Sequence, residues 1–297
     1  MNNKKLSDWL IASDIDGTLN DKSRRLVRRN YEAIHKYIDE YGGNFTLASG
    51  RNPESMRKHF KRLDINDGKA VVINGAGIYD FAEEKYIWTS PLNDHCIEMI
   101  RKCTKKFPTL AFQAITDDAV LIFRPTVSAR ILAINAKAKV KYYYNFEKMP
   151  KENWYKVIFT GIPPAMKALE KFVINMSNTT ENLMYSSPWS YEIVNEDTNK
   201  GKAVLKLAEM LGVEKEHTAA IGDYFNDYEM LRAVGFPACC GQAPKGMKKI
   251  AKLVTCHCNL GAVADLIEHI IKNYSLVGFL MVENRKNEVM LIAAKVR

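Results

Sequence analysis

Short apolar runs alternate with longer segments of helical period in the first third of the chain. The runs WLIAS, NFTLASG and KAVVINGAGIYD are bounded by turn-forming residues, as strands are. A strand, helix, strand order implies right-handed crossovers and a parallel sheet buried between helices. Gly42 and Gly43 should end the first helix, because glycine adopts the left-handed backbone conformation at low cost. The sequence therefore predicts strands within 9–13, 44–50 and 69–80, and helices within 28–43 and 53–64.

The pattern changes at about residue 83. Strand-like runs such as AVLIFRP and WYKVIFTGIP then dominate, with helical stretches at 93–106, 127–138 and 164–177 between them. The alternation of strands and helices returns after Asn195. We therefore predict an α/β protein with a core of residues 1–82 and 192–274, an inserted α+β domain of residues 83–191, and an extension of residues 275–297 whose two apolar runs favour a β-hairpin.

The composition is that of an ordinary globular protein. The chain has 297 residues, of which 47% are hydrophobic and 26% charged, and this length exceeds what one hydrophobic core usually supports. Its formal net charge of +9 favours anionic partners. The densest basic run, Lys22–Arg29, has no interleaved aromatic residues. We interpret it as a solvated helix face, and we do not expect nucleic acid as a partner.

No targeting segment or membrane span is expected. The N-terminal apolar stretch runs directly into acidic residues, and no segment approaches the ~18 uninterrupted apolar residues of a spanning helix. We therefore expect a cytoplasmic protein whose six cysteines remain thiols. A zinc site would be the alternative role for five residues close in sequence, but their spacing lacks paired CxxC motifs, so buried thiols are favoured. These residues are Cys239, Cys240, Cys256, His257 and Cys258.

Two carboxylates follow the first predicted strand. Asp14 and Asp16 are two residues apart, so on an extended backbone they point to the same side, and ligands of open parallel sheets bind beyond such strand ends. A divalent cation would reduce their mutual repulsion, and Mg²⁺ prefers oxygen ligands. Gly17 would allow the backbone to turn sharply there. The alternative is a pair of turn-forming aspartates without a ligand.

A second acidic pair follows a later apolar run. Asp223 and Asp227, with Asn226 between them, lie where the strand in HTAAIGD leads into a helix. Acidic clusters at two strand ends of one sheet would meet at a single metal site. The alternative is capping of the helix N-terminus, which is a common role of Asp and Asn.

Two further residues suit an anion beside such a metal. Ser49 ends the apolar run TLAS, where its hydroxyl and the free amides of the next turn could hold phosphate oxygens. Lys200 stands at a predicted helix start, where a positive charge is unfavourable with respect to the helix dipole unless an anion is bound. The alternatives are a turn serine and a solvated lysine.

Together these motifs resemble the haloacid dehalogenase superfamily. DIDGT, LASGR, Lys200 followed by Gly201, and GDYFND occur in the order and approximate spacing of that superfamily, over about residues 9–272. The stretch VINGAGIYD and the place of the inserted domain are similar to the Cof-type branch, which includes sugar phosphatases. The resemblance implies Mg²⁺-dependent phosphoryl transfer on a Rossmann-like core that carries an α+β cap.

The resemblance also implies a role for each motif. Asp14 would be the nucleophile that forms an aspartyl phosphate, and Asp16 would protonate the leaving oxygen and then activate water. Asp14, Asp223 and the backbone carbonyl of Asp16 would hold Mg²⁺, with Asp227 supporting them. The residues expected at the transferred phosphoryl group are Ser49, Lys200 and Asn226.

We therefore predict a phosphatase that hydrolyses small phosphate monoesters, either sugar phosphates or phosphorylated cofactors. A phosphomutase or phosphotransferase, and a non-enzymatic sensor of a phosphorylated metabolite, remain alternatives. Arg51 and Asn74 are expected near the substrate, and Trp189 is expected to pack in a strand rather than to stack on a ligand. The stretch ACCGQA departs from the small-residue AMGNA pattern of relatives, so Cys239, Cys240 and Gln242 should change the packing behind the last acidic cluster. The oligomeric state is not predicted.

Overall fold

The computed structural model describes residues 6–65, 68–127, 129–131, 139–177, 183–195 and 198–275. The chain divides into two compact units, one of Met1–Ala48 with Val204–Arg297 and one of Ser49–Ala203. The domain bounds expected from sequence stay a prediction. The β-hairpin expected within 275–297 lies outside the described residues.

The first unit contains a parallel sheet with the strand order β14-β13-β12-β1-β2. Every residue of β1 and β12 is buried, as expected for strands covered by helices on both faces. Ser13 of β1 is in register with Ile221 of β12, so these two neighbouring strands end side by side. The predicted α/β fold is confirmed. The strands are β1 (Leu10–Ser13), β2 (Asn44–Ala48), β12 (Thr218–Gly222), β13 (Phe236–Cys239) and β14 (Leu253–Val254).

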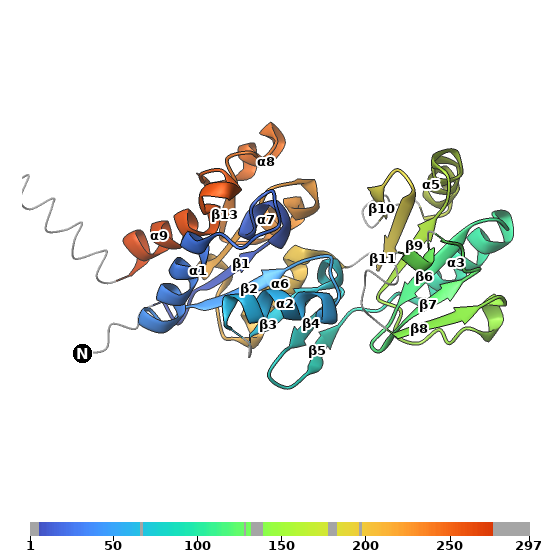
Figure 1. Cartoon of the computed structure of the whole chain (residues 1–297), viewed down its shortest axis with the longest axis horizontal. Helices are drawn as coiled ribbons and strands as arrows, with labels where there is room; N and C mark the ends of the chain where they lie inside the picture. The colour runs from blue at the N-terminus through green and yellow to red at the C-terminus, as the bar shows by residue number, and fades with distance from the viewer. Residues whose placement is uncertain are drawn as a thin grey trace, which may run out of the picture. The chain divides into compact units, whose positions relative to one another are not determined.

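Helices from opposite ends of the chain pack together in this unit. α1 (Arg28–His35) lies beside α9 (Ala262–Tyr274), as Figure 1 shows. The chain stays helical through Lys36–Glu40 and then reaches Gly42, whose φ of 67° confirms the predicted stop. The other helices here are α6 (Lys200–Met210), at whose first turn the chain passes between the two units, α7 (Tyr228–Ala233) and α8 (Lys245–Ile250).

The second unit begins with α2 (Pro53–Leu63), whose cap residue Asn52 accepts a hydrogen bond from the Ser55 amide at 3.0 Å. The apolar run 69–80, expected to be one strand, is two. β3 (Lys69–Val72) and β4 (Gly77–Asp80) are antiparallel, and β5 (Lys85–Thr89) pairs with β4. The reversal occurs at Asn74 and Gly75, with φ of 57° and 99°. Asparagine and glycine are the residues that tolerate this left-handed backbone best.

The second unit also contains a six-stranded sheet with the order β10-β11-β9-β6-β7-β8. Its strands pair antiparallel except for β7 and β8. Two helices, α3 (Asp94–Lys106) and α5 (Pro163–Ser177), contact each other and share one apolar core with the sheet, so the predicted α+β segment is confirmed. The strands are β6 (Ala111–Ile115), β7 (Ala119–Phe123), β8 (Lys139–Tyr143), β9 (Lys156–Thr160), β10 (Leu183–Ser187) and β11 (Ser190–Val194).

In the part of the chain that the structure describes, no helix has the length and apolar character needed to cross a membrane. All six cysteines are free thiols. Cys239, Cys240 and Cys258 are buried, whereas Cys256 is partly exposed. The interpretation of this cysteine cluster as thiols in the protein interior is therefore largely confirmed.

The basic run ends in an ion-pair cluster between helices. Arg29 of α1 contacts Asp265 at 2.6 Å and Glu268 at 2.8 Å, both on α9. Asp265 also accepts a hydrogen bond from the Cys256 amide at 2.7 Å. Burial acts to raise the pKa of Asp265, but the Cys256 backbone and side chain and the Arg29 guanidinium together hold this pKa below its ordinary value.

We predict that Asp265→Asn lowers the free energy of unfolding by about 1 kcal/mol at neutral pH, because the charge-assisted bonds are lost at a partly exposed site. Since the pKa of the folded state is depressed, the contribution of Asp265 exists above its unfolded-state pKa and disappears as the pH falls through its folded-state pKa. Urea unfolding of both proteins at a series of pH values measures this. A difference that stays constant down to strongly acidic pH would contradict it, and Glu268→Gln, at a more exposed position, should have the smaller effect.

Candidate functional site

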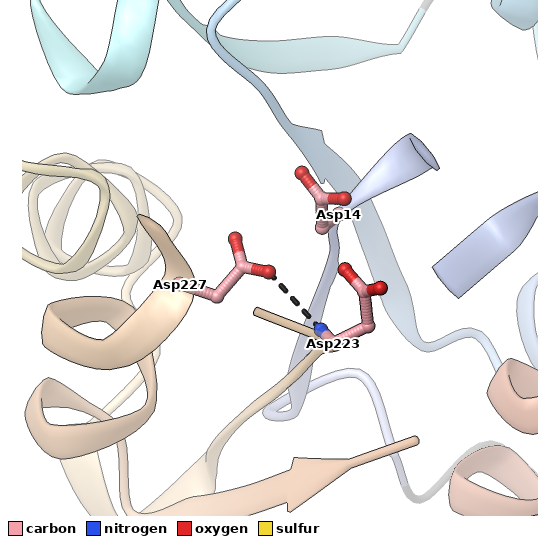
Figure 2. Close-up of side chains that lie close together, drawn as sticks. All are labelled: Asp14, Asp223 and Asp227. Atoms are coloured by element: carbon pink, nitrogen blue, oxygen red, sulfur yellow. Dashed lines mark hydrogen bonds between the residues drawn. The ribbon is translucent and has the colours of Figure 1, made fainter. Parts of the chain in front are cut away.

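Two aspartates lie at the ends of neighbouring parallel strands. Asp14 follows β1, and Asp223 follows β12. The Asp14 amide donates to the carbonyl of Ile221 at 3.0 Å, so the backbone fixes where the Asp14 side chain begins. Asp14 is 5% exposed. Figure 2 shows the two carboxylates beside each other, as the sequence predicted for two strand ends of one sheet.

The third carboxylate comes from the turn before α7. Asp227 is fully buried, and its Oδ2 accepts a hydrogen bond from the Asp223 amide at 3.1 Å (Figure 2). It makes no capping bond to its own helix, so the capping alternative for this residue is wrong. Gly222 allows this packing, because a Cβ there would lie 2.4 Å from Asp227 Oδ2. Asp227 therefore orients the backbone that carries Asp223.

Each of Asp14, Asp223 and Asp227 offers an oxygen atom, and these atoms lie within 4.8 Å of one another. Three carboxylates so close, two of them buried, repel one another strongly when ionised. A divalent cation between them would attract all three carboxylates and so offset this repulsion. A donor set made only of carboxylate oxygens fits a hard cation such as Mg²⁺.

A tight turn links Asp14 to the rest of the chain. The Leu19 amide donates to the Asp14 carbonyl at 3.3 Å, and within this turn Gly17 has a φ of 82°. A Cβ on Gly17 would lie 2.4 Å from Asp223 Oδ2, so only glycine fits both the backbone and the space. The Asp16 side chain is exposed and is not part of the carboxylate cluster.

Two of the predicted phosphate-binding residues, Ser49 and Lys200, belong to the second unit. Ser49 is 4% exposed, and its hydroxyl accepts a hydrogen bond from the Arg51 amide at 3.4 Å. Lys200 begins α6, as predicted, and is 2% exposed, so the solvated-lysine alternative is wrong. The turn after β3 meets the residue before this helix, because a Cβ on Gly75 would lie 2.3 Å from the carbonyl oxygen of Asn199.

Asn74 lies against the loop that follows Ser49. A Cβ on Gly50 would be 2.6 Å from Asn74 Oδ1, and the Asn74 amide is 3.0 Å from the Ser49 carbonyl oxygen, to which it donates. Thus the structure brings Ser49, Arg51 and Asn74 together within one unit. Asn226 lies in the other unit, in the turn that ends at Asp227, and is exposed.

A buried ion pair beside this loop was missed from sequence. Lys156 of β9 contacts Glu192 of β11 at 3.1 Å, and each residue is 6% exposed. Glu192 accepts from Asn74 Nδ2 at 3.4 Å, and Lys156 Nζ donates to the Gly50 carbonyl at 3.4 Å. One signal could have indicated the pair, because each residue is the single charge in an otherwise uncharged strand.

The expected packing role of Trp189 is wrong. This side chain is 57% exposed in the turn between β10 and β11. The apolar face of the sheet is filled instead by residues such as Trp154 and Phe159.

We predict that Gly17→Ala weakens divalent cation binding strongly, because its methyl group would displace the Asp223 carboxylate. Gly212→Ala is the matched control: Gly212 has a φ of 70°, but nothing lies within 4 Å of its added Cβ. Both variants should lose about 1 kcal/mol of folding free energy from backbone strain. Calorimetric titration with Mg²⁺ should show reduced affinity for Gly17→Ala alone. Equal affinities of the two variants would contradict this reading of the turn.

Comparison with known proteins identifies the family of this chain. The family model of the haloacid dehalogenase-like hydrolases matches residues 11–267. A "Putative phosphatase" of Streptococcus pyogenes is 24% identical over 270 residues, which cover 90% of this chain and 100% of that protein. A phosphoglycolate phosphatase of Archaeoglobus fulgidus is 26% identical over 245 residues, which cover 82% of this chain and 89% of that protein.

The fold is similar to that of solved members. A sugar phosphatase of haloacid dehalogenase subclass IIB superimposes with a TM-score of 0.72 at 20% identity, over 88% of this chain and 98% of that structure. This likeness supports the fold. The range matched by the family model includes Asp14, Asp223 and Asp227. The chain belongs to the haloacid dehalogenase-like hydrolases.

Proposed function

We propose that this hydrolase is a Mg²⁺-dependent phosphatase that acts on small phosphate monoesters through an aspartyl-phosphate intermediate. The observation that carries the proposal is the cluster of Asp14, Asp223 and Asp227 at the ends of two adjacent parallel strands. The names of the phosphatase relatives support the same reaction class.

In this proposal Asp14 is the nucleophile, and Asp16 is first the general acid and then the general base. The Asp14 carboxylate attacks phosphorus, the bond from phosphorus to the leaving oxygen breaks, and Asp16 gives its proton to that oxygen. Asp16 then takes a proton from water, whose oxygen attacks phosphorus and releases Asp14. Their surroundings suit these roles, because Asp14 is buried and fixed by the backbone whereas Asp16 is exposed to incoming substrate.

Mg²⁺, when bound, neutralises charge on the phosphoryl oxygens. The residues that would hold it are Asp14, Asp223 and the backbone carbonyl of Asp16, while Asp227 keeps Asp223 in place through its backbone amide. Ser49 and Lys200 bind the remaining phosphoryl oxygens. A buried lysine at the start of α6 is favourable when an anion shares that position. Asn226 is the further polar contact in this proposal.

The pair of Lys156 and Glu192 suggests the chemistry of the leaving group. A hydroxyl can accept a hydrogen bond from the ammonium group and donate one to the carboxylate, so the pair suits a hydroxylated substrate. The pair has no net charge, which gives a second phosphate no advantage. We therefore favour sugar or polyol monophosphates, with Arg51 and Asn74 as neighbouring contacts.

We predict that Asp14→Asn reduces turnover by several orders of magnitude while the fold is retained, because the amide is a poor nucleophile. Phosphate release from p-nitrophenyl phosphate and from a panel of sugar phosphates, with Mg²⁺ and with EDTA, measures this. Asp39→Asn is the control, since that carboxylate is exposed and lies 3.3 Å from His35 Nδ1. Metal-independent release, or release retained in Asp14→Asn with an unchanged circular dichroism spectrum, would disprove the assignment.

A double variant, Lys156→Met with Glu192→Gln, should raise KM for sugar monophosphates about tenfold and leave p-nitrophenyl phosphate hydrolysis nearly unchanged. Both charges are removed together, because one left alone would be buried without its partner. Steady-state kinetics with the two substrate types measures the difference. The same loss with both substrates would show that the pair stabilises the fold rather than selecting the leaving group.

A further inference from the structure

The segment after β13 lies against the turn that carries Asp16. The Cys240 amide donates to the Gly222 carbonyl at 3.1 Å, and the Gly241 amide donates to the Cys256 carbonyl at 3.0 Å. Gly241 is tightly enclosed, because a Cβ there would be 2.9 Å from the Thr255 carbonyl oxygen. The backbone around Gln242 is therefore held from two sides.

Both the nitrogen and the oxygen of the Gln242 side-chain amide make hydrogen bonds. Its Nε2 donates to the Gly17 carbonyl at 2.6 Å, and its Oε1 accepts from the Cys258 amide at 3.0 Å. The chemistry fixes the orientation of the amide. A backbone amide of Cys258 can only donate, so it must face the oxygen, and the carbonyl of Gly17 can only accept, so it must face the nitrogen. A half-buried side chain thus joins the turn to the loop before α9.

Gly17 is the point at which support matters most. Glycine can adopt more backbone conformations than any other residue. Gly17 must nevertheless keep a φ of 82°, with its α-carbon close to the Asp223 carboxylate. Other bonds hold the ends of this turn, such as Asn30 Nδ2 to the Leu19 carbonyl at 2.8 Å. The hydrogen bond from Gln242 is made to the middle of the turn, at the carbonyl of Gly17, which follows Asp16.

We infer that Gln242 is a positioning residue that holds the Asp16–Gly17 turn, so that the Asp16 carboxyl group reaches the leaving oxygen. This inference rests on the proposed phosphatase reaction. It goes beyond the change in packing expected at Gln242, because both polar ends of its side chain make directed hydrogen bonds. The Cys240 thiol, two residues before Gln242, is fully buried with its Sγ 3.7 Å from Thr18 Oγ1, so it adds packing to the same turn.

The test uses Gln242→Met, which keeps the side-chain length and removes both hydrogen bonds. Its matched control is Lys248→Met, which removes the bond from Lys248 Nζ to the Gly241 carbonyl at 2.6 Å in the same segment and leaves Gly17 untouched. Gln242→Glu is the second variant, because it still accepts from the Cys258 amide but cannot donate to Gly17. Thermal unfolding identifies any variant that does not fold.

The measured quantity is kcat/KM for two phosphate esters whose leaving groups differ. Glycerol phosphate has a poor leaving group that needs protonation by Asp16, whereas p-nitrophenyl phosphate needs little. We expect both Gln242 variants to lose about tenfold in kcat/KM for glycerol phosphate and much less for p-nitrophenyl phosphate, with Lys248→Met unchanged. An equal loss for both esters, the same loss in Lys248→Met, or no loss would overturn the inference.

Hydrogen exchange provides a readout that needs no activity. The amides of Leu19 and Asn20, which close the turn, should exchange faster in Gln242→Met and remain unchanged in Lys248→Met. Unchanged exchange in Gln242→Met would overturn the positioning role whatever the kinetics show. A wild-type protein that hydrolyses neither ester with Mg²⁺ would instead overturn the proposed function, so the two failures are distinguishable.

Discussion

Repulsion among the carboxylates of Asp14, Asp223 and Asp227 is the constraint on which this site depends. At separations below 5 Å, two ionised carboxylates repel by about 3–4 kcal/mol if the effective dielectric constant is about 20. The protein holds them together with backbone interactions that do not change on ionisation. These are the register of β1 with β12 and the bond from the Asp14 amide to the Ile221 carbonyl. The Asp227 side chain is held separately, because its carboxylate accepts a hydrogen bond from the Asp223 amide. The carboxylates are therefore already close together before a cation binds, and the cation is attracted to all of them at once.

The same constraint explains the small residues around the cluster. Gly222 admits the Asp227 side chain, and Gly17 admits that of Asp223, because an added Cβ would overlap a carboxylate oxygen in either place. At Gly17, this close approach of the backbone to a carboxylate leaves no side chain that could restrain the turn. Restraint comes from outside the turn, where Gln242 and Asn30 bind its carbonyl oxygens. Fine positioning of Asp16 therefore depends on residues distant in sequence.

The sequence predicts those parts of the site that follow from local patterns. Asp14, Asp223 and Asp227 each come directly after a buried strand or its turn, so the parallel order of strands was enough to place them together. The reversal at Asn74 was missed because the stretch was interpreted as one strand, although Asn74 and Gly75 form a turn-favouring pair between its two apolar runs. For Asp227 the local capping pattern pointed to the wrong partner, since a tertiary contact to the Asp223 amide prevailed.

Residues that act through distant contacts could not be placed from sequence. Gln242 and Gly17 are 225 positions apart, and Lys156 meets Glu192 only because β9 and β11 are neighbours in the sheet. Trp189 was expected to pack because tryptophan usually does, but its turn leaves it exposed. The assignments of Ser49, Lys200 and Asn226 to the phosphoryl group stay predictions.

The most direct measurement is a crystal structure of the protein grown with Mg²⁺ and beryllium trifluoride, which mimics a phosphoryl group bonded to a carboxylate. We expect beryllium bonded to an Asp14 carboxylate oxygen, with Mg²⁺ bound by Asp14 and Asp223 beside it. Fluoride density at another residue, or Mg²⁺ bound away from the three carboxylates, would contradict the assignment of Asp14 as the nucleophile of a metal-dependent phosphatase.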